Sequence, residues 1–154
     1  MQFETQLMPD EKSVLQALGY RGAQPDAQTA ANLHTALERM QAAAHARWVS
    51  RRFTLVQPPS LAEAGLPLAG DDIAAHLQGC HSCMLLAVTL GDEVERTTRA
   101  AQASDMGMAV LLDAAASVLT EQYANAAESL LRTEYEKQGW YLTGRFSPGY
   151  GDFS

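Results

Sequence analysis

The stretch Ser104–Gln122, SDMGMAVLLDAAASVLTEQ, begins the longest element that the sequence predicts. Ser104 and Asp105 suit the cap and first turn of a helix. Asp113 is the only charged residue inside the helix up to Leu119, so we expect this half to be buried almost all round. The helix continues through charged sequence to Gly139, a length of ~50 Å at about 1.5 Å per residue. Its predicted apolar face holds Met108, Leu111, Leu112, Ala115, Val118, Leu119, Tyr123, Ala126 and Leu130.

On the N-terminal side of this helix, the pattern predicts two helices and two strands. Residues 1–8 alternate as in a short strand, and a short helix runs from Asp10 to Gly19. A longer helix begins near Asp26, and residues 51–57 form a strand that ends at two prolines. The apolar stripe predicted for the longer helix is Leu33, Leu37, Met40, Ala44 and Trp48, and the strand places Phe53 and Leu55 on one face.

The remaining elements lie on both sides of the long helix. Residues 71–80 read as a short helix, and the uninterrupted apolar run of residues 83–90 is typical of a central strand. A charged helix follows Gly91, and residues 140–146 have the aromatic and β-branched composition of a final strand. Strands and helices are mixed without a regular strand–helix–strand repeat, so we expect an α+β fold in one domain of 154 residues.

Charge and composition exclude several classes of protein. The net charge is −7 and the apolar fraction is 47%, which argues against nucleic-acid binding and against disorder, whereas cationic ligands are tolerated. Two cysteines make no disulfide framework, and no apolar run approaches the length of a membrane span. The N-terminus lacks the features of a secretory signal, so we expect a cytoplasmic protein.

The segment HLQGCHSC, residues 76–83, raises two metal hypotheses. Two cysteines and two histidines within eight residues invite a zinc site, but such sites usually join ligand pairs across a longer loop. Buried thiols at a helix-to-strand junction are the favoured alternative. HLQG is also half of a cobalamin-binding signature, but the position two residues before His76 holds Ala74 instead of the orienting aspartate. We therefore expect neither a metal ligand set nor cobalamin binding by His76.

The segment RFSPGYG, residues 145–151, has two interpretations. Pro148 and Gly149 fit the central positions of a type II β-turn. The same geometry suits a ligand site, because Gly149 and Gly151 leave the backbone accessible, Tyr150 offers a flat ring, and a guanidinium binds carboxylates with two parallel hydrogen bonds. Arg145 and this loop would suit a nucleoside that carries an amino acid.

Three stretches of the chain, taken together, resemble a known family. DDIAAHLQGCHSCMLLAVTLGDEVER (71–96), SDMGMAVLLDAAASVLTEQ (104–122) and WYLTGRFSPGYGD (140–152) are together similar to the activation (reactivation) domain of vitamin B12-dependent methionine synthase, and more closely to its small stand-alone homologues. The three stretches cover most of residues 71–152. The arginine followed shortly by Pro-Gly-Tyr is the most specific motif.

The resemblance implies a helmet-like α+β fold with a twisted antiparallel sheet and long helices. It implies that the chain binds S-adenosylmethionine and presents the methyl group to cob(II)alamin on a separate corrinoid methyltransferase, with an electron from a flavodoxin-type donor. Arg145 would hold the methionine carboxylate, and Pro148, Gly149, Tyr150 and Gly151 would line the loop around the ligand. The chain would then be a component of a methyltransferase, with no catalytic residue or metal of its own.

Two departures from the family pattern support a rival hypothesis. The family has an acidic residue shortly before the arginine, where this chain has Gly139, and the nearest acids are Glu134 and Glu136. Family members also continue beyond the motif with further sheet-forming sequence, so an apparently shortened chain would have open sheet edges prone to self-association. The rival is a non-catalytic interaction or assembly module that keeps the fold but has lost S-adenosylmethionine binding.

Overall fold

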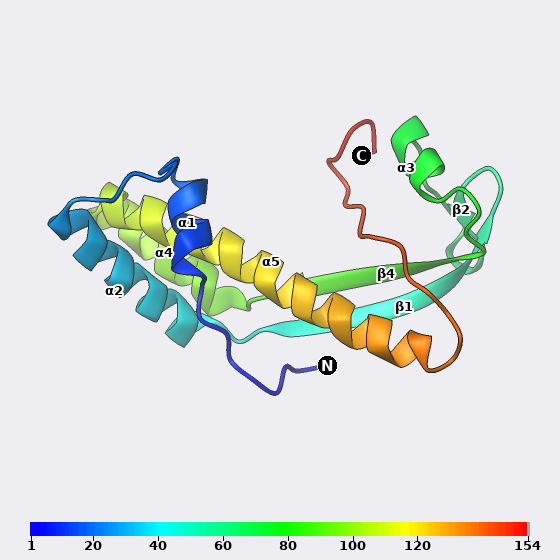
Figure 1. Ribbon diagram of the computed structural model, residues 1–154, viewed down its shortest axis with the longest axis horizontal. Coiled ribbons are helices and arrows are strands. Elements are labelled where there is room, and N and C mark those ends of the chain that lie inside the picture. Colours follow the sequence, from blue (N-terminus) through cyan, green and yellow to red (C-terminus); the bar gives the residue numbers. More distant parts are fainter. Residues whose placement is uncertain (154) are drawn as a thin grey trace. The chain divides into compact units, whose positions relative to one another are not determined.

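The computed structural model describes residues 1–153 and confirms the α+β class. Four antiparallel strands form an open sheet in the order β3-β2-β1-β4, accompanied by five α-helices among the described residues (Figure 1). The chain divides into two compact units. The first unit comprises Met1–Trp48 with Val88–Leu131, and the second comprises residues 49–87 with 132–153. The single activation-type domain inferred from the sequence stays a prediction.

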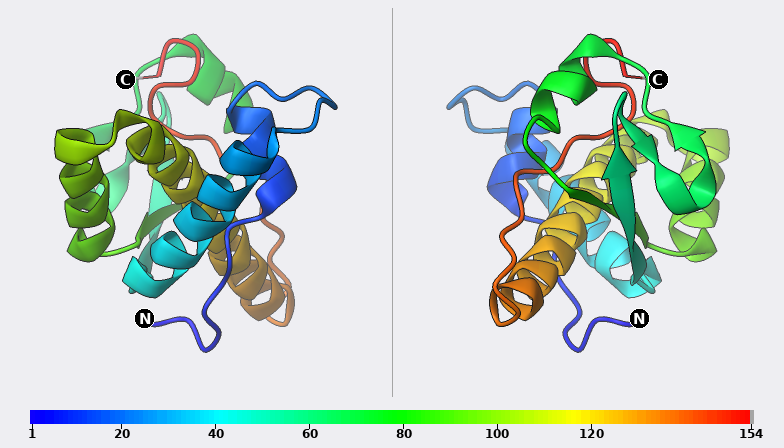
Figure 2. Two further views of the ribbon diagram at one scale, coloured as in Figure 1. Left: turned by 90° about the vertical axis from the view of Figure 1, so that its left-hand side faces the viewer. Right: turned by 90° about the vertical axis from the view of Figure 1, so that its right-hand side faces the viewer.

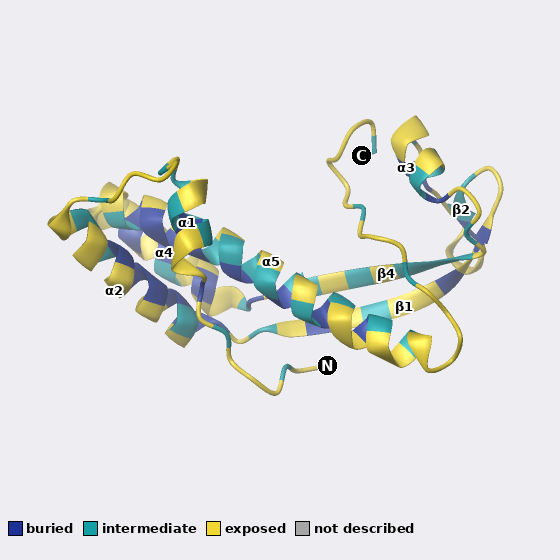
Figure 3. Cartoon of the chain, in the orientation of Figure 1, coloured by how far each residue is buried: buried dark blue, intermediate teal, exposed yellow. Residues whose placement is uncertain are grey.

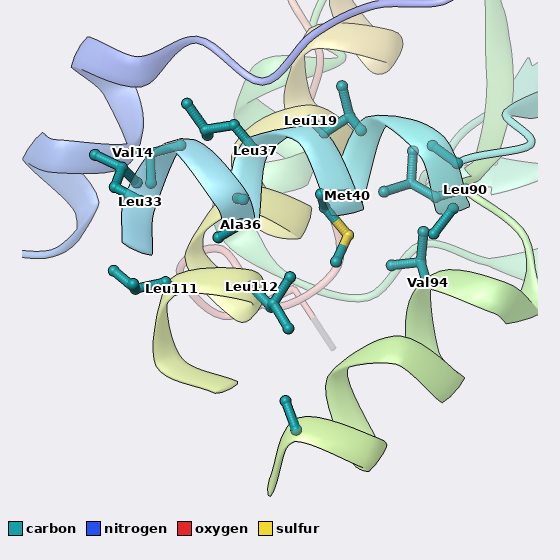
Figure 4. Packing of buried hydrophobic residues seen from close by; sticks show 14 of the residues in the cluster. Val14, Leu33, Ala36, Leu37, Met40, Leu90, Val94, Leu111, Leu112 and Leu119 are labelled. Atoms are coloured by element: carbon teal, nitrogen blue, oxygen red, sulfur yellow. The ribbon is translucent and has the colours of Figure 1, made fainter. Parts of the chain in front are cut away.

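The first unit is a helical cluster. It contains α1 (Glu11–Ala17), α2 (Ala27–Ala43), α4 (Asp92–Ser104) and most of α5 (Met106–Glu136). Figures 1 and 2 agree that α1, α2 and α4 gather around the first part of α5. Their buried side chains point toward one another in Figure 4 and include Val14, Leu33, Met40, Leu112 and Leu119, all at most 1% exposed. This apolar cluster is the larger of the two cores.

Three helices of the first unit, α1, α2 and α5, begin at capping side chains, whereas α4 begins after Gly91 without a side-chain cap. The carboxylates of Asp10 and Asp26 accept the backbone N–H groups of Ser13 and Thr29 at 2.8 and 2.9 Å. Asp105 accepts the N–H of Met108 at 3.0 Å at the start of α5. Such bonds satisfy N–H groups that have no partner inside a helix, and they fix where each helix starts.

The second unit holds most of the sheet. β1 (Arg47–Val56) pairs with β2 (Ser60–Leu61), which pairs with β3 (Leu66–Pro67), and a short 3-10 helix (Ala62–Ala64) joins the last two. β4 (Ser82–Thr89) lies on the other side of β1, and α3 (Asp71–His76) precedes it. The second core is formed by Phe53, Leu55, Leu61, Leu68, Ile73 and Leu77. The burial of Phe53 and Leu55 on one face of β1 confirms the prediction for this strand.

Two boundaries in the first half of the chain differ from the prediction. Residues 1–8 form no strand, and Gln2 makes one isolated bridge to Arg47 at the start of β1. The second helix ends at Ala43, and Trp48 is a buried residue of β1. The helical spacing from Leu33 to Trp48 was misleading, since a period-2 strand begins before that spacing is completed.

Three later elements also differ from the prediction. β4 is the edge strand rather than a central one, so its apolar run is only partly covered. The first half of α5 is not buried all round, because Val110 is 52% exposed. Near the C-terminal end of the helix, Leu131 is buried and Leu130 is exposed. Figure 3 shows exposed positions along the whole of α5. Residues 140–146 form no strand; side-chain contacts of the second unit hold them instead. Among the described residues, no helix is long and apolar enough to cross a membrane.

Candidate functional loop at the C-terminal segment

The segment Ser147–Phe153 folds into two successive turns. Tyr150 N–H donates to the Ser147 carbonyl at 3.2 Å, and Phe153 N–H donates to the Tyr150 carbonyl at 3.1 Å. Gly149 N–H donates to the Phe153 carbonyl at 2.7 Å and closes the loop. Gly149 has a φ of 92°, the left-handed value that the second central position of a type II turn requires. The predicted turn at Pro148 and Gly149 is confirmed.

Asp152 attaches this loop to α3. Its carboxylate accepts the N–H groups of Asp71 and Asp72 at 2.6 and 3.1 Å, whereas the local cap position, Gly70, has no side chain to offer. These two hydrogen bonds lower the pKa of the Asp152 carboxyl because they favour its ionised form. A residue 81 positions away therefore supplies the cap that the helix lacks locally. The C-terminal loop and α3 lie side by side in Figures 1 and 2.

Two glycines allow this close approach. A Cβ on Gly151 would overlap the carboxylate of Asp72, and a Cβ on Gly70 would lie 2.7 Å from an oxygen of Asp152. Both glycines also have positive φ. A Cβ on Gly149, in contrast, would meet nothing within 4 Å. Gly151 is thus required for packing against α3, and Gly149 is required by the turn itself.

Aromatic contacts anchor the same segment. The Phe146 ring lies 5.2 Å from the His76 ring, 6.2 Å from Tyr150 and 6.0 Å from Phe153, measured between centroids. Phe146 and Phe153 pack against the second core. His76 Nε2 lies 2.9 Å from the Gly144 carbonyl oxygen, which places this histidine against the segment as a structural contact.

The stretch between α5 and the loop is held by two arginines. Arg132 donates to the carbonyl oxygens of Leu142 and Thr143 at 2.6 and 3.3 Å. The guanidinium of Arg52 lies 5.1 Å from the Trp140 ring centroid and 5.9 Å from that of Tyr135. These contacts replace the strand hydrogen bonds that the composition of residues 140–146 predicts.

The structure brings the five predicted site residues into one exposed loop. Arg145, Pro148, Gly149, Tyr150 and Gly151 are all exposed, and the Tyr150 side chain retains 64% of its accessible surface. The loop contains one acid, Asp152, and lies against another, Asp72, at Gly151. Gly139 lies in the turn that follows α5 and has a φ of 78°. Glu134, one of the two acids nearest in sequence, accepts a hydrogen bond from Gln138 at 3.0 Å.

The two cysteines are half-buried thiols that pack against the second core. Burial raises the pKa of the Cys83 thiol, and the neighbouring Cys80 raises it further. Within the described residues, no group of three or more histidine, cysteine or acidic side chains is placed to hold a metal ion. The arrangement fits the packing interpretation of these thiols.

Two grooves lie in the first unit and involve none of the predicted site residues. One, of about 480 Å³, is lined by Leu90, Glu95, Thr98, Asp113 and Ser117 among others. The second, of about 700 Å³, lies between the N-terminal residues and the end of α2. The C-terminal loop is therefore a surface feature distinct from both grooves.

Sequence reasoning missed the residues that position the loop: His76, Asp152, Phe146 and Phe153. One signal was present for Asp152. The helix GDDIAAH begins after a glycine without a capping side chain, which indicates that its first N–H groups are satisfied from elsewhere in the chain. The contact between His76 and Phe146 has no comparable signal, because these residues are 70 positions apart in the sequence.

The fold and the loop together define an α+β domain with an open antiparallel sheet and an exposed, tightly turned Pro-Gly-Tyr-Gly segment. No model of a known protein family matches the chain, and no curated protein matches it.

Proposed function

We propose that the chain is an S-adenosylmethionine-binding domain that assists the reductive reactivation of a corrinoid-dependent methyltransferase. The observation that supports this proposal is the conformation of the RFSPGYG segment, residues 145–151. Its glycines are committed to the turn and to α3, while Arg145 and Tyr150 remain exposed on that fixed frame. A ligand site benefits from such an arrangement, because a loop backbone that is already ordered loses less entropy on binding.

Each proposed role follows from the chemistry of the group. The planar guanidinium of Arg145 binds the methionine carboxylate, and the Tyr150 ring packs against the ligand. Asp72 supplies negative charge beside Gly151 for the ammonium or sulfonium, in the absence of an acid at Gly139. The chain binds and orients the methyl donor, and the acceptor is cobalamin held by a partner protein. A flavodoxin-type protein supplies the electron.

Calorimetry tests the proposal. S-adenosylmethionine is titrated into the wild-type chain, into Arg145→Ala and into Arg21→Ala, a control that removes an exposed arginine of the first unit. Loss of a charge-assisted hydrogen bond costs about 1.5–3 kcal/mol, so Arg145→Ala should weaken binding by roughly 10- to 100-fold. Arg21→Ala should bind like the wild type.

The outcomes separate the parts of the proposal. Absence of binding heat with the wild-type chain, at two temperatures, would contradict S-adenosylmethionine binding. Equal affinities of wild type and Arg145→Ala would contradict only the role of Arg145. Asp72→Asn tests the acidic partner in the same way, with a loss of affinity expected.

The second candidate is an interaction or assembly module that does not bind the ligand. It is favoured by exposed aromatic residues in the second unit: Tyr141 is 83% exposed and Trp140 is 44% exposed, with Arg52 over the Trp140 ring. Trp, Tyr and Arg are the residues that contribute most at protein interfaces. A wild-type chain that binds no S-adenosylmethionine would favour this function over the first.

A further inference from the structure

The two edges of the sheet differ in how they are protected. On one side β2 pairs only with Leu55 and Val56 of β1, so the earlier part of β1 borders this edge together with β3, and it carries the charges of Arg51 and Arg52. β3, at one end of the strand order, has two residues, and one of them is Pro67, which has no N–H to offer a new strand. β4, at the other end, has eight residues with the sequence SCMLLAVT. This strand contains no charge, no proline and no glycine. Natural edge strands usually carry at least one such feature to prevent unwanted pairing, so β4 is exceptional.

Both faces of β4 are apolar and partly accessible. Leu85 is 41% exposed, and Ala87, on the same face, is also exposed. Met84, Leu86 and Val88 lie on the opposite face and are half-buried. Figure 3 shows exposed and half-buried positions along β4. An added strand would therefore gain backbone hydrogen bonds along the edge and apolar contacts on both faces.

We propose that β4 is a self-association site, at which a second copy of this chain pairs through its own β4 in antiparallel orientation. The second copy is favoured because β4 is self-complementary. Pairing about a two-fold axis centred on Leu85 or Leu86 places the apolar residues in the middle of β4 opposite one another, with Ser82 and Thr89 at its ends, and it desolvates no charged group. A charged partner strand would place its charges against Leu85 or Leu86 and lose their hydration.

The dimer is weak and depends on salt. Eight paired residues extend ~27 Å, which is a small contact compared with the roughly 800 Å² per partner of stable interfaces. Each copy carries a net charge of −7, so the copies repel at long range, and salt screens this repulsion. The association therefore increases with protein concentration and with ionic strength. This inference is independent of S-adenosylmethionine binding.

Sedimentation analysis of the full chain over a wide concentration range, at low and raised salt, tests the proposal. The wild-type mass should rise toward that of a dimer and no further. Leu85→Lys, which places a charge on the edge strand, should weaken dimerisation by on the order of tenfold or more. Val56→Lys is the matched control, because Val56 is 43% exposed and lies on β1, where it already pairs with Ser60 of β2. It should dimerise like the wild type.

Two further measurements keep the test decisive. Ala87→Lys replaces Leu85→Lys if the latter fails to fold, as judged by circular dichroism. Hydrogen exchange should show that amides of β4 become more protected at higher protein concentration, while those of α2 do not change. A wild type that stays monomeric at every concentration and salt, or an equal loss of dimer in Val56→Lys, would overturn the proposal.

Discussion

The position of the C-terminal loop depends on one side chain, the carboxylate of Asp152. It accepts two backbone N–H groups at the start of α3, and the residue beside it, Gly151, leaves no room for a Cβ next to Asp72. A single side chain thus caps a helix and fixes the loop that carries Arg145 and Tyr150. The acceptor is an ionisable carboxylate, so the strength of the contact should depend on pH.

The expected pH dependence follows from the lowered pKa of Asp152. A carboxyl whose pKa is lower in the docked state contributes its full stabilisation above the ordinary aspartate pKa of ~3.9 and loses it as the pH falls through the docked value. We expect the loop to release α3 under acidic conditions and to stay docked at neutral pH. Amide chemical shifts of Asp71, Asp72 and Gly151, followed by NMR during an acid titration, measure this release.

Asp152→Asn is the control for that titration. The amide keeps an acceptor oxygen but cannot ionise, so the acid-induced shift changes that belong to Asp152 should disappear. Identical titrations of wild type and Asp152→Asn would show that Asp152 does not control the docking of the loop.

At the scale of elements, α5 organises the first unit through one buried stripe. Leu112 is 0% exposed within the core, whereas Val110, two residues earlier, is 52% exposed. Leu112→Ala should lower the free energy of unfolding by about 2–5 kcal/mol, because it removes buried methyl groups and leaves a cavity. Val110→Ala should change it by no more than about 0.5 kcal/mol. Urea denaturation measures both, and similar losses for the two variants would contradict this orientation of α5.

The elements also show what the sequence can predict. Helix starts at Asp10, Asp26 and Asp105 were predictable, because a capping side chain acts on N–H groups two or three residues away. The position of β4 at the edge was not, since an apolar run fits a central strand as well as an exposed edge. Residues 140–146 have strand-like composition, yet contacts from Arg132 and His76 decide their conformation. Such contacts depend on tertiary structure.

The same distinction applies to the candidate site. The turn at Pro148 and Gly149 was predictable because its requirements are local. The attachment of the loop to α3 was not, because it depends on an approach between Gly151 and Asp72, which are 79 residues apart in sequence. Sequence alone therefore indicated which residues form the loop but not what holds it.

At the scale of the whole molecule, three elements are shared by the two units. β1 crosses the division after Trp48, β4 after Ala87 and α5 after Leu131. A helix or strand that loses its packing at one end loses support along its length, because its backbone hydrogen bonds form cooperatively. Continuous elements of this kind couple the stabilities of the units through the chain itself.

The two tryptophans allow this coupling to be measured, because each reports one unit. Trp48 is buried in the first unit, and Trp140 lies in the second. In a Trp140→Phe background, Leu61→Ala weakens the core of the second unit, where Leu61 is 0% exposed. The unfolding transition reported by Trp48 should then move to lower urea by an amount that corresponds to about 2–5 kcal/mol.

Leu66→Ala, at a residue of the same unit that is 48% exposed, should leave the Trp48 transition nearly unchanged. An unchanged Trp48 transition in Leu61→Ala, while circular dichroism detects an earlier loss of structure, would show that the units unfold independently.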